Sequence, residues 1–195
     1  MSLRWFTSRM SPEESPTPVE PPPNAEQAWK ALGLIVDWIK HAETKAAATI
    51  AGAAADGVAL YNLVKDADYA STYFIVATTI CGTLALCAGL CAGIALWPRL
   101  RSNEPPTSLL YFQHIARAHP TADGYVTSMI SLTKDIEALV TEIARQGWAN
   151  SRVAHRKYIW GARAIACLLL SLAALATAAA IRLASPILLS LNIVV

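Results

Sequence analysis

The chain has 195 residues and a formal net charge of +2 at pH 7, with 54% apolar residues and only 15% charged ones. Because soluble domains carry about 25% charged residues, this composition is unlike that of a soluble domain. The apolar residues concentrate in two uncharged runs, 69–98 and 164–181, each long enough for a helix to cross a bilayer roughly 30 Å thick. The sequence therefore predicts an all-α, multi-pass membrane protein.

The N-terminal region, residues 1–23, has no apolar signal-peptide core, so we expect the N-terminus to stay in the cytoplasm. It contains the stretch "SPEESPTPVEPPP", whose prolines cannot enter a helix interior. This composition predicts a disordered or polyproline-like arm. Asn24 then caps a cytoplasmic helix over 24–45, which should continue without a break into the first span.

Residues 46–64 form the first predicted span, rich in Ala and Gly and bounded by two lysines. Asp56 lies near its centre, where an acid costs about 2.5–3.5 kcal/mol on insertion scales. It should therefore face the bundle interior or water. Three interpretations of Asp56 stay open: a membrane function in a subunit contact or an ion path, a passive hydrogen-bonded acid, and a tilted helix that places the acid at a shallow depth.

An external link over 65–71 leads to the second span, 72–97, so these two spans should form an antiparallel hairpin. Residues 98–158 form a cytoplasmic helical head. Thr107 or Ser108 should cap its first helix, which should end at about Ala118. A second, longer helix should follow "TADG" and continue into the third span at 159–181, because apolar residues alternate at four and three positions. The apolar positions of that stripe are Tyr125, Met129, Leu132, Ile136, Leu139 and Ile143.

The remaining residues, 182–195, are too short to cross the bilayer again and contain Pro186, so we expect an external apolar tail at the interface. Lysines and arginines gather before the first span, after the second span and before the third span, so residues 1–45 and 99–158 should be cytoplasmic. The C-terminus should then be external.

No nucleotide-binding glycine loop, metalloprotease motif or nucleophile elbow occurs, so an enzyme is not expected and no catalytic residue is assigned. The four cysteines fall inside the apolar runs without metal-ligand spacing, and we expect them to pack as small residues. Basic residues of the head either anchor it to anionic lipid or form a pocket for an anionic ligand. The candidates for such an anionic-ligand pocket are Arg99, Arg101, His114, Arg117, Lys134, Asn150, Arg152, Arg156 and Lys157.

Three stretches, "WKALGLIVDWIKHAETKAA", "YFQHIA" and "SRVAHRKYIWGARA", resemble the transmembrane effectors of the bacterial Pycsar antiphage system, within a wider class of SLATT-like helical membrane effectors. The resemblance covers about residues 25–182. The positions that match the family pattern are Glu43, Lys45, Phe112, Lys157 and Tyr158.

The resemblance implies an inner-membrane effector that binds cyclic UMP or cyclic CMP from a partner cyclase and then impairs the membrane of the infected cell. We expect no cofactor, no metal and no nucleic-acid partner. A homo-oligomer is the natural way for three spans per chain to damage a bilayer. The alternative is a constitutive small membrane protein, a holin-like pore or an assembly subunit, without a nucleotide ligand.

Overall fold

The structure is a computed structural model, and it describes residues 23–65, 67, 71–97 and 108–192, with side chains as far as residue 184. Within these residues the chain forms five helices and no strand, which confirms the all-α prediction. The helices are α1 (Ala25–Lys65), α2 (Thr72–Leu96), α3 (Phe112–Ala118), α4 (Ala122–Lys134) and α5 (Ile136–Asn192). The predicted arm up to residue 22 and the last three residues lie outside the described part of the chain.

Helix α1 is one uninterrupted element of 41 residues, or roughly 60 Å. Asn24 caps it as predicted, because its Oδ1 accepts a hydrogen bond of 3.1 Å from the backbone N–H of Gln27. A helix of this length is about twice as long as the hydrocarbon core is thick. One part of α1 can therefore cross a bilayer while the other extends beyond it.

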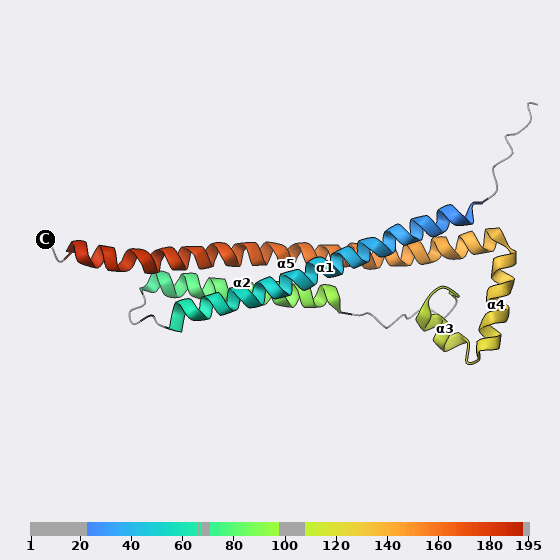
Figure 1. Cartoon of the computed structure of the whole chain (residues 1–195), viewed down its shortest axis with the longest axis horizontal. Coiled ribbons are helices and arrows are strands. Elements are labelled where there is room, and N and C mark those ends of the chain that lie inside the picture. Colours follow the sequence, from blue (N-terminus) through green and yellow to red (C-terminus); the bar gives the residue numbers. More distant parts are fainter. Residues whose placement is uncertain (1–22, 66, 68–70, 98–107, 193–195) are drawn as a thin grey trace, which may run out of the picture.

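Three helices, α1, α2 and α5, pack along one another and make up most of the molecule (Figure 1). The buried residues between them are mostly alanines, in two clusters around Ala92 and Ala178. Small side chains let helix backbones approach closely, as in membrane proteins. Large apolar side chains point outward instead, among them Leu86, Leu90 and Leu169. All three helices are long and apolar enough to cross a membrane.

Helix α5 has 57 residues and extends from the head through the third predicted span. It continues past the predicted end of that span at Ile181 as far as Asn192, so Pro186 does not end the helix. A proline removes one backbone hydrogen bond and can kink a helix, but the helix can continue on its far side. The sequence reasoning gave this proline too much weight.

The prediction of one long helix after "TADG" is wrong. The chain leaves the helical conformation at Asp135, which separates α4 from α5, and α4 turns away from the axis of α5 (Figure 1). Asp135 Oδ1 accepts a 3.0 Å hydrogen bond from the N–H of Ala138, so this aspartate caps α5. The apolar stripe therefore belongs to two helices, because a local cap competes with helix continuation.

The bounds of the two short helices also differ from the prediction. Helix α3 begins at Phe112 rather than near Ser108, whose Oγ accepts a hydrogen bond from the N–H of Leu110 in a turn. Helix α4 begins at Ala122, within "TADG", because Thr121 caps it through the N–H of Gly124 at 3.3 Å.

Candidate functional site

The first polar site joins α1, α2 and α5 near one end of the packed alanine core. Lys157 Nζ donates hydrogen bonds of 2.9 Å to Glu43 Oε1 and of 2.9 Å to the carbonyl oxygen of Ala95. The Lys157 side chain is only 13% exposed, whereas that of Glu43 is 45% exposed. Ala95 lies in the last turn of α2, where the helix dipole favours a cation. We call Glu43, Lys157 and the Ala95 carbonyl the clasp.

A second contact lies beside the clasp. Lys45 Nζ lies 5.8 Å from the ring centroid of Tyr158, which is a cation–π distance. Glu43 and Lys45 both come from α1, and Lys157 and Tyr158 both come from α5. Four of the five positions that the sequence analysis assigned to the family pattern therefore meet as two neighbouring pairs. This is a relationship that the sequence pattern did not show.

The fifth motif position and one candidate ligand residue have other surroundings. Phe112 lies in α3, is exposed, and packs edge-to-face on Tyr111 with ring centroids 5.0 Å apart. Lys157 is not only a family-pattern position but also one of the candidates for the anionic-ligand pocket. Because its ammonium group already has two acceptors in the clasp, the structure gives it a role in joining helices.

The third polar site lies inside the bundle of α1, α2 and α5, and each of these helices contributes one residue. Asp56 is 2% exposed, and Cys81 and Ser171 are fully buried. The Cys81 thiol donates to Asp56 Oδ2 over 3.8 Å, and Ser171 Oγ forms a short hydrogen bond with the same carboxyl oxygen. Ser171 Oγ also lies 2.8 Å from the carbonyl oxygen of Cys81. We call these three residues the core cluster.

Asp56 faces the interior of its own chain's bundle. Of the two positions expected from the sequence, the bundle interior and water, the structure shows the first. Its second carboxyl oxygen, Oδ1, is buried and has no hydrogen-bond partner among the described residues. The sequence reasoning read Cys81 as packing only and did not single out Ser171. A serine in an otherwise apolar run was the signal that could have found it.

The candidate residues of the predicted basic pocket have different surroundings, and the pocket itself stays a prediction. Arg99 and Arg101 lie outside the described residues. The remaining arginine and lysine candidates outside the clasp are exposed, namely Arg117, Lys134, Arg152 and Arg156. The Arg152 guanidinium lies 5.1 Å from the ring centroid of Trp148, so it stacks on its own helix.

Two other candidates, His114 and Asn150, belong to one chain of polar contacts. The backbone N–H of Ser108 donates to His114 Nδ1 at 3.2 Å, and Ser108 Oγ donates to Gln146 Oε1 at 3.5 Å. Gln146 Nε2 in turn donates to Asn150 Oδ1 at 3.2 Å. These contacts hold the turn before α3 against α5. The buried His114 therefore has a structural partner, which the sequence did not indicate.

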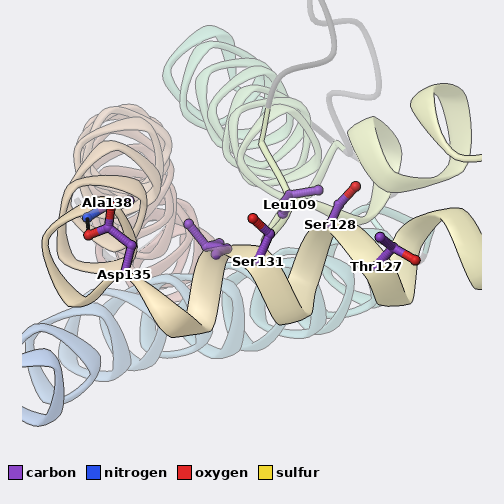
Figure 2. A pocket seen from close by; sticks show the side chains of 7 residues that line it. Leu109, Thr127, Ser128, Ser131, Asp135 and Ala138 are labelled. Atoms are coloured by element: carbon purple, nitrogen blue, oxygen red, sulfur yellow. Dashed lines mark hydrogen bonds between the residues drawn. The ribbon is translucent and has the colours of Figure 1, made fainter.

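A surface hollow of about 510 Å³ lies where α4 meets α5. Figure 2 shows hydroxyl-bearing side chains of α4 along one side of it and Asp135 with Ala138 at the break. Its lining residues are Leu109, Thr127, Ser128, Ser131, Leu132, Asp135 and Ala138. We call it the elbow hollow. The sequence reasoning missed it because it had placed a continuous helix through Asp135.

No group of three or more His, Cys, Asp or Glu side chains that could hold a metal ion occurs in the described part of the chain.

These features define a class of protein: a helical membrane protein with three candidate spans, in which two of the spans continue as helices into a polar head. The chain belongs to the Pycsar effector family PycTM, since residues 27–184 match the family described as the Pycsar effector protein domain. It is also 29% identical over 160 residues to the Pycsar effector protein PtPycTM of Propioniciclava tarda, a match that covers 80% of this chain and 79% of that protein. No solved structure matches the chain. The family resemblance seen in the sequence is confirmed.

Proposed function

We propose that this chain is an antiphage defence effector that binds a cyclic pyrimidine mononucleotide, cyclic UMP or cyclic CMP, and then impairs the inner membrane of the infected bacterium. A partner cyclase supplies the nucleotide upon infection. Membership of the Pycsar effector family supports the defence role. Beyond that role, we propose that the chain binds the nucleotide, that it damages the membrane, and that the cell is then arrested or dies.

The observation that carries the proposal is the continuity of α5 between the head and the membrane bundle. A ligand that prefers one packing of the head can shift the equilibrium of the spans, because the same rigid helix takes part in both. Lys157 lies on α5 between these two parts and bonds to both α1 and α2. A displacement of α5 would therefore act on all three spans at once.

The proposed topology places the head and the N-terminus in the cytoplasm and the C-terminus outside. Lys40 and Lys45 of α1 and Arg152, Arg156 and Lys157 of α5 lie at the same end of the bundle, which supports this orientation. A cytoplasmic head would meet a nucleotide made in the cytoplasm. Several copies would associate to damage the bilayer, since one chain supplies three closely packed helices.

The test has a binding arm and a cellular arm. Calorimetry of the full chain in detergent should detect cyclic UMP or cyclic CMP, and no heat with either nucleotide from folded protein would overturn the proposal. In cells, the membrane potential should collapse only when an active uridylate or cytidylate cyclase is co-expressed. A catalytically dead cyclase is the control. Collapse that needs no cyclase would instead support a constitutive pore.

A further inference from the structure

The elbow hollow lies at the place where the head meets the helix that continues into the membrane bundle. Its walls come from α4, from Leu109 in the turn before α3, and from Asp135 and Ala138 at the start of α5. Its volume of about 510 Å³ falls within the range of roughly 300–1,000 Å³ that small-molecule sites occupy. The location and the size both suit a ligand that acts on the angle between the two helices.

The lining of the hollow offers mainly hydrogen-bond acceptors. Thr127 Oγ1 and Ser128 Oγ donate their protons to carbonyls of their own helix, at 2.9 Å and 3.1 Å, so their oxygens can only accept from a ligand. Asp135 uses Oδ1 to cap α5 at Ala138. A carboxylate has about four acceptor positions, so Asp135 can bind a further donor. A ligand that presents hydroxyl or N–H groups therefore matches these three acceptors.

A cation lies on the same side of α4 as the hollow. Lys134 follows the lining residue Thr127 by seven positions, which returns to the same helix face within about 20°. Lys134 is exposed and forms no ion pair with a described residue. Its long side chain can reach an anionic group at the rim while the uncharged part of the ligand occupies the hollow.

Resting on the proposed function, we infer that the elbow hollow is the binding site for the cyclic mononucleotide. A 3′,5′-cyclic nucleotide has one free ribose hydroxyl, the 2′-OH, which donates to Asp135, as acidic side chains do for ribose in dinucleotide sites. Lys134 pairs with the cyclic phosphate. The pyrimidine lies toward Leu132 and the hydroxyl groups of α4. A bound ligand then bridges α4 and α5 and favours one angle at Asp135.

The experiment is calorimetry of the full chain in detergent with cyclic UMP, cyclic CMP and their 2′-deoxy analogues. Asp135→Asn keeps the cap oxygen for Ala138 but removes the charge, so the fold is retained. We expect this variant to lose about tenfold or more in affinity for the ribonucleotide. The affinity of this variant for the 2′-deoxy analogue should stay close to that of the unmodified chain, because this ligand has no 2′-OH to donate to residue 135. Asp123→Asn, in the first turn of α4, is the matched control and should bind like the unmodified chain.

Lys134→Ala should weaken both the ribonucleotides and their deoxy analogues, whereas Lys40→Ala on α1 should not. Two outcomes overturn the inference: unchanged affinity of Asp135→Asn and Lys134→Ala, or equal losses of Asp135→Asn for the ribo and deoxy ligands. If the unmodified chain binds neither cyclic nucleotide, the proposed function fails together with the site. Binding that these variants leave unchanged means that the ligand binds elsewhere, and the proposed function stands.

Discussion

Lys157 and Glu43, 114 positions apart in the sequence, join α5 to α1 through a 2.9 Å hydrogen bond, while the same ammonium group holds the last turn of α2. The clasp thus gathers three helices at one mostly buried charge. The sequence analysis singled out Glu43 and Lys157 separately, and in the structure they are partners in one contact. The clasp is also where the head and the membrane bundle adjoin.

Glu43→Gln should lower the free energy of unfolding by about 1–2 kcal/mol, because a mostly buried ammonium group loses its charged partner while keeping the Ala95 carbonyl. The apparent Tm in detergent measures this loss. Glu26→Gln is the matched control, since Glu26 pairs with Lys30 on the exposed surface of the same helix, where such pairs contribute little. Equal shifts for the two variants would show that the clasp adds nothing beyond a surface pair.

Substitutions in the core cluster should separate membrane insertion from function. Asp56→Ala should insert normally, since it removes an acid from an apolar helix, yet it should alter toxicity after cyclase induction because the three helices lose their shared polar contact. Ser171→Ala removes the same hydrogen bond from the other side and should change toxicity in the same direction. Growth after induction and membrane fractionation are the measurements.

If both Asp56→Ala and Ser171→Ala kill and assemble like the unmodified chain, then the core cluster is a passive feature of packing. Thr177→Ala provides a control on the same helix, because its hydroxyl is exposed and bonds only to the carbonyl of Ala173. It should leave toxicity unchanged.

Two glycines of α1 offer a test of close helix packing. A Cβ at Gly52 would lie 2.9 Å from Cδ2 of Leu168 on α5, whereas a Cβ at Gly57 would meet nothing within 4 Å. Gly52→Leu should therefore destabilise the bundle by about 1–3 kcal/mol, as overpacking does. Gly57→Leu should be neutral or slightly stabilising, because leucine favours helix more than glycine. Thermal unfolding in detergent compares the two, and a larger loss at Gly57 would contradict this packing.

His114 should act as a structural residue of the head. Replacing this buried side chain with alanine leaves the Ser108 N–H without its Nδ1 acceptor, at a cost of about 1–3 kcal/mol. Amide hydrogen exchange over 108–118 should then become faster. His155→Ala, at an exposed position of α5, should leave this exchange unchanged. Loss of nucleotide affinity without faster exchange would return His114 to the ligand site.

The sequence by itself determined the helical class, the three candidate spans and the family. Composition and uncharged length decide whether a helix can cross a bilayer, and these are properties of contiguous residues. The Asn24 cap and the continuity of α1 could also be predicted, because both depend on neighbouring residues within one or two helical turns. For Asp56, the cost of a charge in an apolar environment left the bundle interior and water as alternatives, and the structure shows the interior.

Only the tertiary structure decided which distant residues meet. Glu43 and Lys157 became partners, and Ser171 and Cys81 became the neighbours of Asp56, because packing of α1, α2 and α5 fixes their relative height and rotation. Sequence periodicity gives the face of each helix but not the register between helices. The break at Asp135 was also missed, because the apolar pattern continued through a residue whose side chain caps the next helix. That local competition created the elbow hollow, the feature on which the ligand-site inference depends.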